Sequence, residues 1–66
     1  MNLKKSISVA LALRSMNRVE LAAIMGISRQ RVYAISNQKR IEIETLIALA
    51  KAFDMKVSEF IALGEQ

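Results

Sequence analysis

Apolar residues recur three and four positions apart in several short stretches of the chain, and this spacing predicts amphipathic helices. The first helix is expected at about 3–16, where Leu3, Ile7 and Leu11 form one apolar stripe. A second apolar stripe on the same helix consists of Val9, Leu13 and Met16. A helix that is apolar on two sides in so short a chain is either wrapped by its neighbours or half buried in a partner, and the pattern favours neither.

Four further helices are expected at about 18–25, 29–36, 43–53 and 57–63. Asn17 precedes the second helix and Glu20 follows three residues later, a pair that can form a capping box. Gly26 ends this helix, as expected where the chain needs a left-handed residue, and Ser28 can cap the third helix. The predicted fold class is therefore all-α, with five short helices.

Length and residue types limit the function as well as the fold. Sixty-six residues support one hydrophobic core, so residues 1–66 are expected to form a single domain. The absence of Cys and His excludes disulfides, zinc fingers, imidazole-ligated metals and the usual Ser-His or Cys-His nucleophile pairs. Two glycines are too few for a phosphate-binding glycine-rich loop. We therefore expect a binding protein that is no enzyme and has no metal, cofactor or small-molecule ligand.

Charge is distributed unevenly along the chain. Residues 1–40 contain eight basic residues and one acidic residue, a net of +7, whereas residues 41–66 contain two basic and five acidic residues, a net of −3. A basic surface of this kind favours a polyanionic partner, although an uneven solvated charge without such a partner would give the same count. The apolar run 7–13 is too short to span a membrane and no small-residue cleavage site follows it, so we expect a cytoplasmic protein.

Residues 18–37 have the spacing of a helix-turn-helix. Ala22 is small where the two helices would cross, and Gly26 lies four residues later, at the turn. The apolar residues that would pack the two helices together are Ile27, Val32 and Ile35. A short turn that sets two helices at a steep angle is the arrangement that defines this motif.

The unit RVELAAIMGISRQRVYAISN at 18–37 and the later stretch IETLIALAKAFDMKVSEFI at 43–61 together resemble the lambda-repressor-like, Cro-type (XRE) helix-turn-helix family. The resemblance covers about residues 7–63 and implies a lambda-repressor-like DNA-binding domain. Four residues depart from the family pattern: Arg18, Gln38, Ile41 and Asp54 stand where Gln, Gly, Pro and Gly are frequent.

The resemblance implies that the helix at 29–36 enters the major groove, where residues near the start of a helix reach base edges. Four residues of this helix are expected to read bases: Arg29, Gln30, Tyr33 and Ala34. Arg29 can pair with guanine, Gln30 can pair with adenine, and Ala34 leaves room for a thymine methyl group. Tyr33 can reach a base or a phosphate. The alternative interpretation is that Arg29 is an ordinary solvated charge and Tyr33 packs against a loop.

Six residues are expected to contact DNA phosphates, namely Arg18, Ser28, Arg31, Asn37, Lys39 and Arg40. Ser28 and Asn37 are positions that the family commonly uses. Such contacts set affinity and its salt dependence, whereas base contacts set sequence preference. Lys4 and Lys5 are further candidates, with a frayed basic terminus as the alternative explanation.

The resulting functional hypothesis is a sequence-specific regulator of transcription, a repressor, that binds double-stranded DNA. Two copies are expected to bind a palindromic operator as a homodimer, with half-site centres roughly 34 Å apart. Two surfaces are candidates for the dimer contact, the second apolar stripe of the first helix and residues 60–63. Two alternatives remain: an antitoxin that binds both DNA and a protein toxin, and a protein-interaction module in which the apolar first helix is the working surface.

Overall fold

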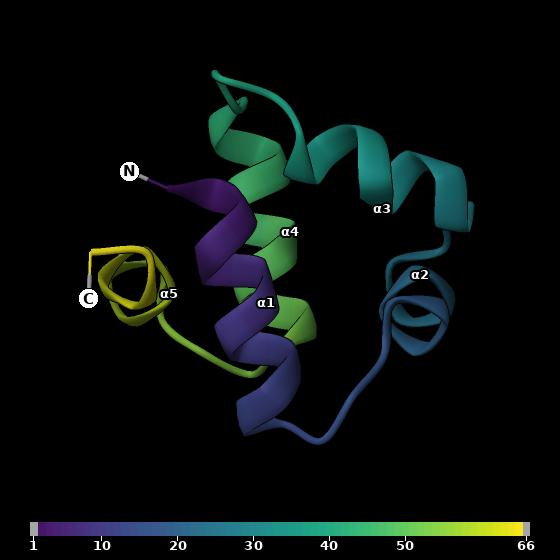
Figure 1. Ribbon diagram of the computed structural model, residues 1–66, viewed down its shortest axis with the longest axis horizontal. Coiled ribbons are helices and arrows are strands. Elements are labelled where there is room, and N and C mark those ends of the chain that lie inside the picture. The colour runs from purple at the N-terminus through teal and green to yellow at the C-terminus, as the bar shows by residue number, and fades with distance from the viewer. Residues whose placement is uncertain (1, 66) are drawn as a thin grey trace.

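The computed structural model describes residues 2–65 and contains five helices within them, with no strand in that range. The helices are α1 (Leu3–Leu13), α2 (Arg18–Met25), α3 (Arg29–Ser36), α4 (Ile43–Ala52) and α5 (Val57–Leu63). In Figure 1, α1 lies in front of α4, α5 is seen end-on at one side, and α2 and α3 lie at the other. The predicted all-α class is confirmed, and all five helices begin at the predicted residues.

One apolar core holds the five helices together, and every helix contributes to it. Its buried apolar side chains are Leu3, Ile7, Ala10, Leu11, Leu21, Ala22, Val32, Ile35, Leu46, Leu49, Ala50, Phe53 and Phe60. The rings of Phe53 and Phe60 stack with centroids 5.8 Å apart and planes at 17°. Because burial of a large apolar side chain contributes roughly 2 kcal/mol, this stacked pair attaches the short helix α5 to the end of α4.

Helix α5 approaches the start of α1 closely, and Gly64 makes this approach possible. A Cβ atom at position 64 would lie 2.6 Å from the carbonyl oxygen of Asn2 and would also meet the hydroxyl of Ser6. Ser6 is fully buried there, and its Oγ has no hydrogen-bond partner among residues 2–65. The contact between α1 and α5 therefore depends on the absence of a side chain at Gly64.

Three of the five helices end in the same backbone arrangement. The amides of Met16, Ile27 and Met55 donate to the carbonyls of Leu11, Ala22 and Ala50 at 2.9, 3.0 and 2.8 Å. In each case the preceding residue is left-handed, with φ of 51° at Ser15, 71° at Gly26 and 55° at Asp54. This is the Schellman motif, which places an apolar residue just beyond the helix against the core. All three such residues, Met16, Ile27 and Met55, are half buried.

The left-handed residue Ser15 explains why α1 ends at Leu13, three residues before the predicted end. The second apolar stripe expected on this helix is therefore broken. Val9 is half buried, Leu13 is 59% exposed, and Met16 packs against the core from the turn instead of from the helix. Helix α4 likewise ends one residue early, at Ala52.

Arg14 joins the ends of α1 and α4. Its Nε donates to the carbonyl of Phe53 at 2.7 Å and its Nη2 to the carbonyl of Asp54 at 3.3 Å. These carbonyls belong to the C-terminal end of α4, where a positive charge is favourable. This arginine is therefore a structural residue that links two segments 39 residues apart.

We predict that glycine is the more stable choice at each of the three left-handed positions, Ser15, Gly26 and Asp54. Ser15→Gly and Asp54→Gly should each increase the free energy of unfolding by about 0.5–1 kcal/mol, because glycine adopts positive φ without steric cost. Gly26→Ala should decrease it by about 1–2 kcal/mol. No atom lies within 4 Å of a Cβ at position 26, so this loss would be purely conformational. Urea unfolding followed by circular dichroism measures all three, and destabilisation by Asp54→Gly would contradict the argument.

Candidate nucleic-acid interface

The turn between α2 and α3 sets the two helices at a steep angle, and Figure 1 shows α2 nearly end-on while α3 runs across the view. Ala22 is buried, and Ile27 is half buried and packs against the core. On α3, Val32 and Ile35 are 1% and 3% exposed. The inward side of α3 is therefore held by apolar packing, and its outward side is exposed.

Side-chain caps begin both helices of the motif. At α2, Asn17 Oδ1 accepts from the amide of Glu20 at 2.8 Å, and the Glu20 carboxylate accepts from the amide of Asn17 at 3.0 Å. At α3, Ser28 Oγ accepts from the amide of Arg31 at 3.1 Å. The predicted capping box and the predicted Ser28 cap are confirmed. Both N-termini, which carry partial positive charge, are thus ordered.

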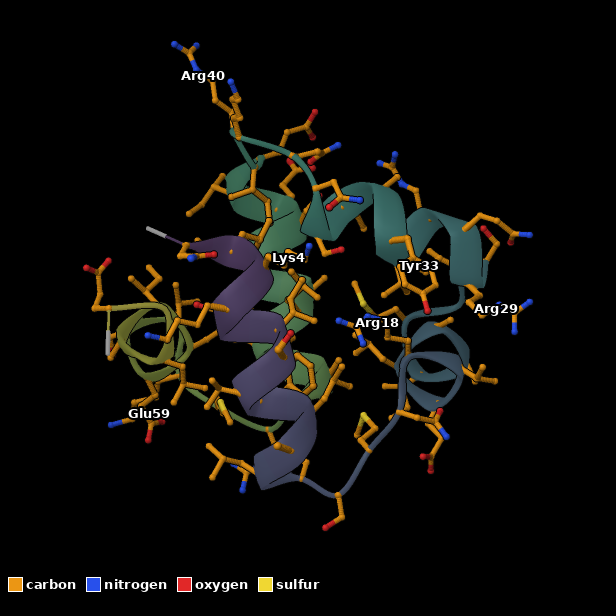
Figure 2. All side chains as sticks on the ribbon, in the orientation of Figure 1. Lys4, Arg18, Arg29, Tyr33, Arg40 and Glu59 are labelled. Carbon is orange, nitrogen blue, oxygen red and sulfur yellow. The ribbon has the colours of Figure 1, made fainter. Side chains whose placement is uncertain are left out.

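The four predicted base-reading residues all lie on the exposed side of α3: Arg29, Gln30, Tyr33 and Ala34. Five of the six predicted phosphate contacts are also exposed: Ser28, Arg31, Asn37, Lys39 and Arg40. Arg40 projects from the loop between α3 and α4, far from Arg29 at the other end of α3 (Figure 2). Arg31 lies on the flank of α3 toward α4, beside a hollow that Ile35 and Glu44 also line.

Three of the predicted residues meet at one hollow of about 490 Å³ between α1, α2 and α3. Its lining includes Ser8, Asn17, Arg18, Arg29 and Tyr33, and we call it the α2–α3 hollow. Arg18 is the one predicted phosphate contact that is half buried. Its Nη2 donates to the hydroxyl of Ser8 at 3.4 Å, and its guanidinium carbon lies 5.4 Å from the centre of the Tyr33 ring.

The contacts of Arg18 were not anticipated from the sequence. Ser8 belongs to α1 and precedes Arg18 by ten residues, and Tyr33 follows it by fifteen. No local spacing rule relates these three positions, because they meet only when α1, α2 and α3 pack together. Tyr33 has an arginine of α2 as a neighbour, a contact that neither interpretation of this tyrosine included.

Two further charged segments lie outside the helix-turn-helix, at the start of α1 and on α5. Lys4 and Lys5 are in the first turn of α1, which is capped by Asn2: its Oδ1 accepts from the amide of Lys5 at 3.0 Å. Glu59 lies on α5, across the molecule from Arg29 and Tyr33 (Figure 2).

Comparison with known protein families agrees with this geometry. The model of the Cro/C1-type HTH DNA-binding domain matches residues 6–65, and the chain therefore belongs to that family. It is a DNA-binding regulator of a family whose members are typically not enzymes. No curated protein and no solved structure matched the chain. Within residues 2–65, no helix has the length and apolar character needed to cross a membrane.

At position 54 the residue type departs from the family pattern, but the backbone has the conformation that glycine favours. Asp54 stands where the family commonly has Gly, and its φ of 55° retains the conformation that glycine adopts easily. The chain therefore keeps the turn after α4 with a residue that is less suited to it.

We predict that Ser28 has two separable roles, capping α3 and facing DNA. Ser28→Ala should lower the free energy of unfolding by about 1 kcal/mol, because the amide of Arg31 loses its partner. Ser28→Asp should keep the cap and the stability, since aspartate is an equally good N-cap, but should weaken DNA binding through repulsion of phosphates. Thermal unfolding and duplex titration measure the two effects. Equal DNA affinity of Ser28→Asp and the parent protein would contradict the placement of Ser28 beside DNA.

Proposed function

We propose that this protein is a sequence-specific repressor of transcription that binds a palindromic operator as a homodimer, with α3 in the major groove. The observation that supports this most is the exposed side of α3, which presents Arg29, Gln30, Tyr33 and Ala34 beside a capped helix start in a chain of the Cro/C1-type family. Repression would follow from occupancy of the operator alone, because no further domain is needed to block a promoter.

The division of labour in this proposal follows from where the side chains lie. Arg29, in the first turn of α3, pairs with guanine through O6 and N7, and Gln30 pairs with adenine through N6 and N7. Ala34 lies one turn further and faces a thymine methyl group. Six residues of the motif and of the loop that follows it bind phosphates: Arg18, Ser28, Arg31, Asn37, Lys39 and Arg40. Their contribution is counterion release, which is independent of sequence.

The size of the domain is compatible with two copies on adjacent half-sites. The Cα trace extends 26 × 24 × 17 Å, and side chains add roughly 3 Å on each side. The longest dimension is therefore similar to the roughly 34 Å between half-site centres. Neighbouring copies on one face of the duplex would lie within contact distance, and their contact would be small. Dimerisation that strengthens on DNA is the expected behaviour.

An antitoxin function is the second candidate, and exposed apolar side chains on α4 favour it. Ile43 and Ile47, one turn apart, are 63% and 40% exposed. A protein partner that covers them would be compatible with DNA binding through α3. A toxin that co-purifies with the parent protein and not with an Ile43→Ser variant would support this candidate.

The proposal predicts the outcome of selecting bound duplexes from a random DNA pool at near-physiological salt. The parent protein should enrich a palindrome with strong guanine and adenine positions in each half. A single unrepeated half-site would retain the DNA function and remove the dimer. No enriched sequence, with binding that only fades as salt rises, would contradict sequence-specific recognition.

Substitutions in the two classes of contact should have different effects. Arg29→Ala or Gln30→Ala should relax preference at one position of each half-site and cost about 1–3 kcal/mol in binding. Lys39→Ala should weaken all duplexes alike and lower the log–log salt slope by roughly 0.9. Titrations of matched and mismatched duplexes at several salt concentrations measure both. A change of base preference in Lys39→Ala would show that the contact assignment is wrong.

A further inference from the structure

Arg18 and Tyr33 form a pair across the two helices of the motif. Arg18 is the first residue of α2, and Tyr33 lies on the exposed side of α3. The guanidinium carbon is 5.4 Å from the ring centroid, within the roughly 6 Å that defines a cation–π contact. Each side chain is therefore the other's neighbour before any DNA is present.

The guanidinium of Arg18 is held from a second direction by α1. Its Nη2 donates to Ser8 Oγ at 3.4 Å. Its Nε is shielded from solvent and has no hydrogen-bond partner in the described part of the chain. A shielded N–H without an acceptor is unfavourable, and an aromatic face is a weak acceptor for such a group. The Arg18 side chain is thus confined between Ser8 and the Tyr33 ring.

Tyr33 is 50% exposed, so one part of its ring is covered and another is available to a partner. Figure 2 shows its side chain directed from α3 toward the start of α2, with Arg18 and Arg29 nearby. An exposed tyrosine in the middle of a helix would otherwise sample several rotamers. In the orientation that contacts Arg18, the ring borders the α2–α3 hollow.

We propose that Arg18 is a positioning residue for sequence recognition: it holds the Tyr33 ring in one orientation, and the base preference that depends on Tyr33 therefore also depends on Arg18. This inference rests on the proposed function, sequence-specific binding through α3. Restricting the ring in the free protein lowers the entropic cost of ordering it on DNA. A residue that acted solely as a phosphate contact would weaken all duplexes equally and leave the preference unchanged.

The experiment compares the duplexes selected by the parent protein, Arg18→Gln, Tyr33→Leu and the double variant. Tyr33→Leu should flatten the preference at one position of each half-site, which identifies the position that Tyr33 reads. Arg18→Gln should reduce discrimination at that same position about twofold to fivefold, as expected for the loss of a cation–π contact. The double variant should show no further loss at this position, because the two residues act as a unit.

Arg40→Gln is the matched control. It removes the same charge from an exposed loop position, far from Tyr33 (Figure 2), and should lower affinity for every duplex without changing the selected sequence. If Arg18→Gln behaves in the same way as Arg40→Gln, the positioning role is overturned. If the parent protein itself enriches no sequence, the proposed function fails and this inference fails with it. If the parent protein enriches a sequence and only the Arg18→Gln result disagrees, the inference alone fails, so the two failures are distinguishable.

A second measurement needs no DNA, because Tyr33 is the sole tyrosine and the chain has no tryptophan. The anisotropy of tyrosine emission therefore reports the motion of this one ring. It should fall in Arg18→Gln and stay unchanged in Arg40→Gln, with circular dichroism verifying that both are folded. If Arg18→Gln does not fold, Ser8→Ala removes one contact of the guanidinium without changing charge and should lower the anisotropy in the same direction. Unchanged anisotropy in the folded variant would overturn the proposal.

Discussion

The packing of α3 on the shared core is the constraint on which the rest of the structure depends. Val32 and Ile35 are buried on its inner side, and an eight-residue helix has little stability of its own in water. Its outward residues Arg29, Gln30, Tyr33 and Ala34 keep their relative positions only while the inner side stays packed. The exposed side of α3 is thus held in place by apolar burial on the other side of the same helix, with the Ser28 cap ordering its first turn.

A chain of this length has few residues to spare for connections, and its helix ends reflect that limit. Three Schellman turns reverse the chain within a few residues and place Met16, Ile27 and Met55 against the core. The connections between the helices thereby contribute apolar side chains to the core. Two of these turns use Ser15 and Asp54 at positive φ, which costs conformational energy. An apolar side chain that packs against the core follows each of these turns.

The basic residues of this protein carry the same charge but differ in burial and in the groups that they contact. Arg14 binds carbonyls at the end of α4 and belongs to the scaffold. Arg29 and Arg40 are exposed and available to a polyanion. Arg18 lies between these classes, because it is half buried and shares its guanidinium with Ser8 and Tyr33. Membership of the Cro/C1-type family shows that this is a DNA-binding domain, and the packing shows which of its basic side chains are exposed.

The sequence by itself determined the starts of the helices, the helix-turn-helix and the outward residues of α3. Caps such as Asn17 and Ser28 act on amides three residues away, and the apolar period shows which side of α3 turns inward, so local rules sufficed. Only the tertiary structure decided where α1 ends, that Arg14 binds α4 and that Arg18 contacts Tyr33. Arg18 and Tyr33 are separated by 15 positions along the chain, and Arg14 and Phe53 by 39. The end of α1 depends on the positive φ of Ser15, a residue that is not glycine. Contacts between helices form only when the helices pack together. They could not be predicted from the sequence because no periodicity or spacing along the chain encodes the distance between two helices.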